Sequence, residues 1–151
     1  MNEEKDIEIV AQEIQEAILK EARKIYSPKV IELSQYPGNL GVIEKANGFG
    51  IIKGICGDTM KIYLRIVRGR VKEAKFETDG CGPTLACGSA ITGMARGKTL
   101  KQVLKLSPSD VLKELGGLPE SHLHCSILAV NALHSAVANY LFLNQDQPKP
   151  E

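Results

Sequence analysis

Hydrophobic residues near the start of the chain recur at three- and four-residue steps, the spacing of an amphipathic helix over residues 3–24. The residues with this spacing are Ile7, Val10, Ile14, Ala17 and Ile18. Acidic side chains stand at the start of the segment, where the helix dipole favours negative charge. A second short helical stretch is expected over residues 29–33, and Pro28, Pro37 and Gly38 mark irregular backbone around it.

The middle of the chain changes to the two-residue alternation of β-strands. Three segments, residues 48–55, 59–67 and 70–78, predict strands. In the second segment, apolar residues at 62, 64 and 66 alternate with Lys, Tyr and Arg, the pattern of a half-buried strand. Arg68 and Gly69 are expected to form the two-residue hairpin turn between the second and third strands.

The remaining sequence predicts helices with recognisable ends. The expected starts are Pro83, Thr99, Ser107 or Ser109, and Ser126. The expected ends are Arg96–Gly97, Gly116–Gly117 and Leu143. The predicted fold class is α+β: a three-stranded antiparallel sheet with helices packed on one side, plus an N-terminal helix. We divide the chain into a helical extension (1–25), one domain (26–143) and a disordered tail (144–151).

Composition narrows the class of protein. The 151 residues suffice for one domain with its own core, and 43% are hydrophobic and 25% charged. The formal net charge of +1 argues against a nucleic-acid partner. The acidic N-terminus lacks a signal-peptide pattern, and the most apolar stretch, residues 127–143, is short for a membrane span and reads as a buried helix. We therefore expect a cytoplasmic protein with no membrane partner.

The four cysteines are Cys56, Cys81, Cys87 and Cys125. Cytosolic thiols stay reduced, so their uneven spacing favours metal binding or reactive thiols over disulfides. Three of them stand at loops or just before predicted helices, in the runs GICGDTM, GCGP and HLHCS. A helix N-terminus favours the thiolate, which binds metal or acts as a nucleophile. Small buried residues are the alternative explanation for these cysteines.

Asp58 and His124 complete the candidate site, since Asp58 follows Cys56 by two residues and His124 precedes Cys125. Three thiolates and one harder ligand suit a tetrahedral zinc ion, and they equally suit an iron–sulfur cluster. The plainer alternatives are an Asx-turn for Asp58 and an exposed loop position for His124.

Several runs together resemble the iron–sulfur cluster assembly scaffold family, of the IscU or NifU N-terminal type. The runs are YSPKVIEL, NLGVIEKANGFGIIKGICGDTMKIYLRI, AKFETDGCGPTLACGSA and GLPESHLHCSILAVNALHSAV. The resemblance covers about residues 26–140, and the order CGDTM, GCGP, HCS is highly specific. The 44-residue step from Cys81 to Cys125 is similar to the IscU/NifU branch, whereas the SufU branch carries an insertion there.

The resemblance implies a carrier rather than an enzyme. It would accept sulfur from a cysteine desulfurase, build a [2Fe–2S] cluster with iron, and pass the cluster to acceptor proteins. By motif, Cys56, Cys81 and Cys125 would be ligands and sulfur acceptors, Asp58 would keep the cluster labile, and His124 would be a candidate fourth ligand. The alternative is a zinc-binding sulfur acceptor or regulator of a desulfurase, with Zn²⁺ on the same residues.

Three features depart from the family pattern. Residues 118–122 read LPESH, where the family's chaperone-recognition stretch is typically Leu-Pro-Pro-Val-Lys, which puts hand-off through an Hsp70-type chaperone in doubt. The residues of this stretch are Leu118, Pro119, Glu120, Ser121 and His122. Cys87 replaces a small residue, and its helical spacing predicts a core position, with an auxiliary thiol near the cluster as the alternative. The helix before Tyr26 is longer than in most relatives and could pack on the domain or on a second subunit, as in a homo-oligomer.

Three other readings carry less weight. A thiol redox enzyme using Cys81 and Cys87 ranks last because the chain has no CxxC motif. GMARGKT, residues 93–99, resembles a phosphate-binding loop, but Thr92 stands where that motif needs glycine, so Gly97 is predicted to end a helix. His134 shares an apolar helix face and is predicted to be a satisfied, semi-buried side chain.

Overall fold

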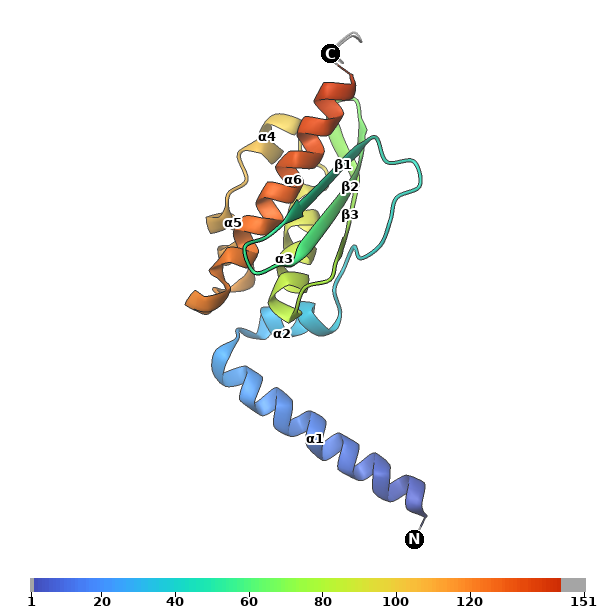
Figure 1. Cartoon of the computed structure of the whole chain (residues 1–151), viewed down its shortest axis with the longest axis vertical. Helices are drawn as coiled ribbons and strands as arrows, with labels where there is room; N and C mark the ends of the chain where they lie inside the picture. The colour runs from blue at the N-terminus through green and yellow to red at the C-terminus, as the bar shows by residue number, and fades with distance from the viewer. Residues whose placement is uncertain (1, 145–151) are drawn as a thin grey trace.

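A computed structural model describes residues 2–144, and it places a sheet, a layer of helices and one projecting helix (Figure 1). The elements are α1 (Glu3–Ile25), α2 (Pro28–Gln35), β1 (Gly48–Lys53), β2 (Thr59–Val67), β3 (Arg70–Thr78), α3 (Gly82–Ala95), α4 (Leu100–Leu104), α5 (Pro108–Leu115), the 3-10 turn η1 (Glu120–His122) and α6 (Leu123–Leu143). The predicted α+β class is confirmed. The tail predicted from residue 144 lies, from residue 145 onward, outside the described residues.

The three strands form an antiparallel sheet in the order β1-β2-β3. Alternation along β2 buries one face completely, because Met60, Ile62 and Leu64 point into the core. Arg68 and Gly69 both have positive φ, 54° and 74°, as a two-residue hairpin of the primed type requires. The strand and turn predictions are therefore confirmed, with β1 ending two residues earlier than expected.

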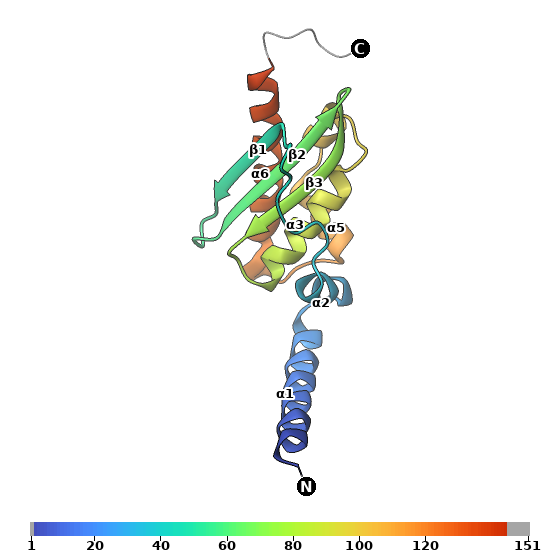
Figure 2. The ribbon, with the colours of Figure 1, turned by 90° about the vertical axis from the view of Figure 1, so that its right-hand side faces the viewer.

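The helices cover one face of this sheet (Figure 2). α6 packs on β1 and β2, and α3 packs on β3. The approach of α6 to β1 is so close that an added Cβ at Gly50 would lie 2.6 Å from the Ala136 nitrogen. Residues 120–143 are long and apolar enough to cross a membrane by length and composition, but their buried face forms the centre of this core.

The helix ends follow local chemistry. Thr99 and Ser107 each cap a helix within a capping box, and Gly116 ends α5 with φ of 75°. Ser107 rather than Ser109 is thus the cap. Pro28 is the first residue of α2 rather than part of an irregular segment.

The predicted start of the last helix at Ser126 is wrong. η1 runs directly into α6, so the helix begins at Leu123 and needs no serine cap. The Ser126 hydroxyl instead donates to the Leu123 carbonyl at 2.6 Å. Cys125 therefore lies inside the first turn of the helix and not in a loop before it.

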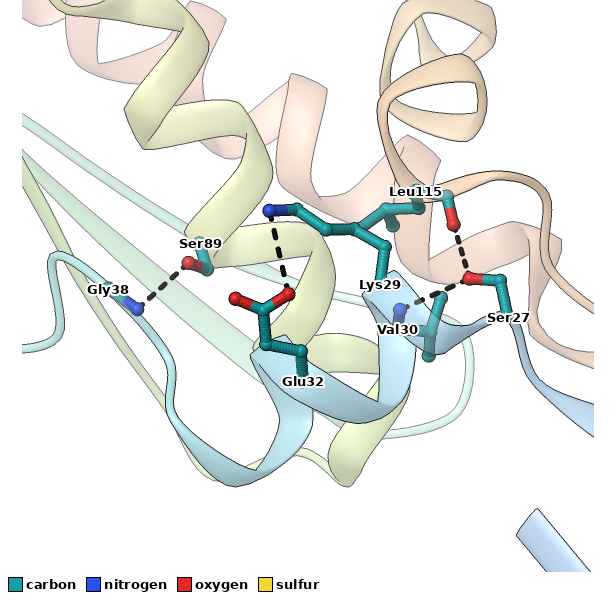
Figure 3. Close-up of polar contacts among 7 residues, drawn as sticks. All are labelled: Ser27, Lys29, Val30, Glu32, Gly38, Ser89 and Leu115. Carbon is teal, nitrogen blue, oxygen red and sulfur yellow. Dashed lines mark hydrogen bonds and ion pairs between the residues drawn. The ribbon is translucent and has the colours of Figure 1, made fainter. Parts of the chain in front are cut away.

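Two serines attach α2 and the segment after it to the domain (Figure 3). The Ser27 hydroxyl accepts from the Val30 N–H at 3.1 Å, which caps α2, and donates to the Leu115 carbonyl at the end of α5. The Gly38 N–H donates to the Ser89 hydroxyl at 2.9 Å. A Lys29–Glu32 ion pair at 3.8 Å lies on the surface and adds little.

In contrast, α1 extends away from the domain (Figures 1 and 2). None of its residues is buried. Most of its large apolar side chains are more than half exposed, namely Ile7, Ile9, Val10, Ile14, Ile18 and Ile25, and only Leu19 is partly covered. The predicted helix is confirmed, while the possibility that it packs on its own domain is wrong for this structure.

Candidate functional site

Three segments that are distant in sequence meet at one end of the sheet (Figure 1). The turn between β1 and β2 carries Cys56 and Asp58, and the loop between β3 and α3 carries Cys81. The first turn of α6 carries His124 and Cys125. The antiparallel order brings the end of β1, the start of β2 and the end of β3 to the same edge, where α3 and α6 begin.

Thr84, in the first turn of α3, connects these segments. Its hydroxyl donates to the Asp58 carboxylate at 3.0 Å. The same oxygen lies 3.5 Å from the Cys125 sulfur and 3.7 Å from the Cys81 sulfur. Thr84 is fully buried, so its hydroxyl is a fixed point at which one residue from each segment converges.

Sequence reasoning missed Thr84. It stands in an apolar helical run, where a threonine resembles an ordinary small core residue. The available signal was its position three residues after Cys81, since Cys81 is the N-cap of α3 and residue 84 lies over it on the same helix face. Gly80 makes room for this side chain, because an added Cβ there would lie 2.6–2.8 Å from the Thr84 side-chain atoms.

Cys56 occupies the exposed part of the site. It lies in the β1–β2 turn, which is closed by the Gly54 N–H donating to the Asp58 carbonyl at 2.6 Å. The Asp58 carboxylate does not form the Asx-turn considered above, because it accepts its hydrogen bond from the Thr84 hydroxyl. The turn is instead attached through Asp79, whose carboxylate accepts from the Thr59 N–H at 2.7 Å, and no sequence pattern predicted this contact.

Cys125 occupies the buried part of the site. Its sulfur lies 3.7 Å from His124 Nε2, on a half-buried ring in the first turn of α6. Burial raises the pKa of the Cys125 thiol, the hydrogen bond with Thr84 opposes that rise, and the charges of Cys81, Asp58 and Cys56 add to it. The two other predicted thiols and the carboxylate are therefore close enough to Cys125 to affect its ionisation.

Cys87 lies behind this site in the core, as predicted. It is fully buried on α3, and burial raises its pKa far above the ordinary range, with smaller contributions from Cys125 and Cys81. A thiol so enclosed does not suit the auxiliary or redox roles. His134 is satisfied as predicted, with Nε2 3.1 Å from the Val103 carbonyl, and Gly97 follows the end of α3 with φ of 83°.

The site is not a ready-made metal cage. Within residues 2–144, no three His, Cys, Asp or Glu side chains are grouped so as to hold a metal ion directly. The Thr84 hydroxyl takes the central place, and the carboxylate points to it. Binding a metal or cluster here therefore requires side chains to turn away from Thr84.

The stretch LPESH directly precedes α6 beside the site, and its histidine contacts Tyr26. His122 Nε2 lies 3.1 Å from the Tyr26 hydroxyl, with ring centroids 5.8 Å apart. Leu118 packs against the core. The stretch is thus tied to the junction between α1 and α2 rather than extended in solvent.

Comparison with known proteins gives consistent results. Residues 25–147 match the family described as NifU-like N terminal domain. The chain is 42% identical over 121 residues to the iron-sulfur cluster assembly scaffold protein IscU 1 of Archaeoglobus fulgidus, covering 80% of this chain and 79% of that protein. It is 37% identical over 119 residues to the scaffold protein IscU of Aquifex aeolicus, covering 77% and 76% of the two chains.

A longer relative and a solved structure extend this comparison. The nitrogen fixation protein NifU of Nostoc is 37% identical over 124 residues, but these cover only 41% of its length and 76% of this chain. The crystal structure of a NifU-like N-terminal protein from Brucella abortus superposes with a TM-score of 0.63 at 17% identity, covering 82% of this chain and 96% of that one. The structural likeness supports the fold, and the sequence relatives support the family.

Proposed function

The chain belongs to the NifU-like N-terminal domain family, and from that premise we propose that it is a scaffold for iron–sulfur cluster assembly. In this role it is a carrier that builds a cluster and releases it, and the cluster is its cargo. The observation that carries the proposal is the convergence of Asp58, Cys81 and Cys125 on the buried Thr84 hydroxyl. Cys56 stands in the adjacent turn, exposed to incoming iron and sulfur.

We assign the cargo as a [2Fe–2S] cluster, which takes four protein ligands. Cys56, Cys81 and Cys125 supply three thiolates. The fourth position falls to Asp58 or to His124, whose ring lies beside Cys125. A weak fourth ligand suits a protein that must give its cluster away, since four thiolates would retain it.

Thr84 has a defined part in this proposal as a positioning residue. Its hydrogen bond holds the Asp58 carboxylate beside the thiols. Because Thr84 is buried on α3, its side chain stays in place when a cluster binds or leaves. The Thr84 hydroxyl thus competes with a bound metal for the Asp58 carboxylate. We therefore expect Thr84 and Asp58 to act together in keeping the cluster releasable.

The proposed partners follow from the chemistry of assembly. Sulfur needs a donor, for which we propose a cysteine desulfurase, and the finished cluster needs acceptor proteins. The most exposed apolar side chain of the site region is Ile55, next to Cys56 and 90% exposed, and it suits contact with such a partner. An Hsp70-type chaperone binding LPESH would first have to break the His122–Tyr26 contact. The exposed thiols also suit a reducing compartment, and we propose the cytoplasm.

Anaerobic reconstitution with iron and sulfide tests the function. The expected result is a coloured [2Fe–2S] species by absorption and Mössbauer spectra, lost in Cys56→Ser, Cys81→Ser and Cys125→Ser. Asp58→Ala should lengthen the half-life of the cluster against a chelator. Thr84→Val should do the same, by up to about tenfold if its bond to the carboxylate is worth the roughly 1.5 kcal/mol typical of a charged partner.

Thr92→Val is the matched control, because Thr92 is also fully buried on α3 but bonds away from the site. Its hydroxyl donates to the Gly88 carbonyl and accepts from the Asn39 side-chain amide. It should leave the half-life unchanged. In the double variant of Thr84 and Asp58, the two effects should not add, since both act through one hydrogen bond. A protein that stays colourless while holding one tightly bound zinc ion would replace this proposal by the zinc-binding regulator of a desulfurase.

A further inference from the structure

We propose that α1 pairs in antiparallel orientation with α1 of a second copy of this chain. The inference begins with an apolar stripe that nothing in the described part of the chain covers. The α1 stripe consists of Ile7, Val10, Ala11, Ile14, Ala17, Ile18, Ala22 and Ile25. Three of its isoleucines, Ile7, Ile14 and Ile18, are 67%, 55% and 57% exposed. A continuous apolar face of this length is unusual on a monomer and marks an interaction surface.

The spacing of the stripe fits a helix pair. Residues 7, 11, 14, 18, 21 and 25 follow the three- and four-residue steps of a coiled-coil seam, and all of them except Glu21 are Ile or Ala. If two copies run in opposite directions and Ile14 faces Ile18 of the partner, then the same alignment places Ile7 against the partner's Ile25. One register therefore satisfies all the large residues of the seam.

A single charged residue, Glu21, interrupts the seam and indicates the direction of pairing. In the antiparallel register Glu21 faces the partner's Ala11, where a small side chain leaves room for the carboxylate to reach solvent. It also has its own counter-ion, Lys24, at 3.1 Å. In a parallel pair Glu21 would face Glu21, which is unfavourable.

The distribution of charge along α1 favours the same direction. Residues 3–13 carry five acidic side chains and one basic side chain, whereas residues 14–25 carry three basic and two acidic side chains. A parallel pair would place two acidic halves side by side. An antiparallel pair places each acidic half along the basic half of the partner, so the charges are complementary.

The occupant is a second copy rather than the chain's own domain, because α1 points away from that domain (Figures 1 and 2). Antiparallel pairing is a closed two-fold contact, with the same surface used by both copies. A helix of 23 residues is about 35 Å long. The two domains would lie at opposite ends of this rod, and each would keep its own set of Cys56, Cys81 and Cys125.

The test compares two isoleucines of the same helix. Ile14 lies on the stripe, and Ile9 lies on the opposite face with nearly equal exposure, 53% against 55%. We expect the wild-type chain to sediment as a dimer at micromolar concentration. Ile14→Glu should raise the dimer dissociation constant at least about tenfold, the effect of about 1.4 kcal/mol. Ile9→Glu should leave it unchanged.

Cross-linking tests the direction. In a chain carrying Cys56→Ser and Cys81→Ser, single variants Ile7→Cys and Ile25→Cys are mixed and oxidised. Antiparallel pairing predicts disulfide-linked dimers between the two variants and none within either variant alone. Links formed within the Ile7→Cys variant alone would indicate parallel pairing and overturn the proposal.

Three other outcomes also overturn it. The first is a wild-type chain that stays monomeric at 100-fold the micromolar concentration used for sedimentation. The second is an equal rise of the dimer dissociation constant in Ile14→Glu and Ile9→Glu. The third is a dimer whose dissociation constant neither substitution changes. Far-UV circular dichroism of both variants checks that the domain remains folded. None of these results depends on cluster binding, so the function proposed above is tested separately.

Discussion

The two halves of the candidate site differ in how firmly the fold holds them. Cys56 is exposed in the β1–β2 turn and Cys81 in the β3–α3 loop, whereas Cys125 and Thr84 are fully buried in the first turns of α6 and α3. The exposed half can meet iron, sulfur and other proteins. The buried half sets the geometry in which iron and sulfur must bind. A site that is rigid on one side and open on the other suits a protein that receives and releases its cargo.

The largest expected difference between the halves is in thiol reactivity. With iodoacetamide under native, reducing conditions, Cys56 and Cys81 should be modified first, and Cys125 later because burial covers it and raises its pKa. Cys87 should react only when the domain unfolds, slower by roughly 10³-fold or more. Mass spectrometry of timed samples measures each rate. Modification of Cys87 as fast as Cys81 would mean that α3 is not packed as described.

The next difference is in stability. Cys87→Ser places a hydroxyl in the core and should lower the free energy of unfolding by about 1–2 kcal/mol. Cys56→Ser changes an exposed side chain and should stay within about 0.5 kcal/mol of wild type. Urea unfolding followed by circular dichroism gives both values. Equal losses in the two variants would contradict the division into an open and a buried half.

The smallest expected difference is in pH dependence. The folded chain raises the pKa of Cys87, so it retains a proton that the unfolded chain releases near pH 8.5. The contribution of Cys87 to stability is therefore complete below pH 8.5 and is lost as the pH rises above it, by at most about 1.4 kcal/mol per pH unit. Comparison of urea midpoints at pH 7.5 and 9.5 should show this loss in wild type and in Cys56→Ser, and a smaller one in Cys87→Ala.

Periodicity predicted the sheet well, because β1 and β2 bury alternate residues along their length. The alternation of Ile62, Leu64 and Ile66 defined β2, and Arg68–Gly69 defined the hairpin. The start of α6 was missed because η1 continues into it without a capping residue. A capping side chain marks where a helix can begin. Here α6 begins without one, because the η1 turn leads directly into it.

The site was only partly predictable. Cys56, Cys81 and Cys125 stand out because cysteine is rare and their flanking residues are distinctive, and the fold brings them to one edge of the sheet. Thr84 does not stand out, because a threonine in an apolar helix has many ordinary explanations. Its importance comes from contacts with residues 26 and 41 positions away, which no local pattern contains. For α1, the sequence gives the apolar face but not what covers it.

The contact at Gly50 has a consequence for how the site can vary. β1 and α6 meet there backbone to backbone, with no side chain between them to lengthen or shorten. The strand leads into the turn that carries Cys56, and the helix carries Cys125. The close contact therefore fixes the position of β1 relative to α6, and with it the points from which the Cys56 turn and Cys125 start. Adjustment to a different cargo is left to residues 54–58, the only part of that path that is neither strand nor helix.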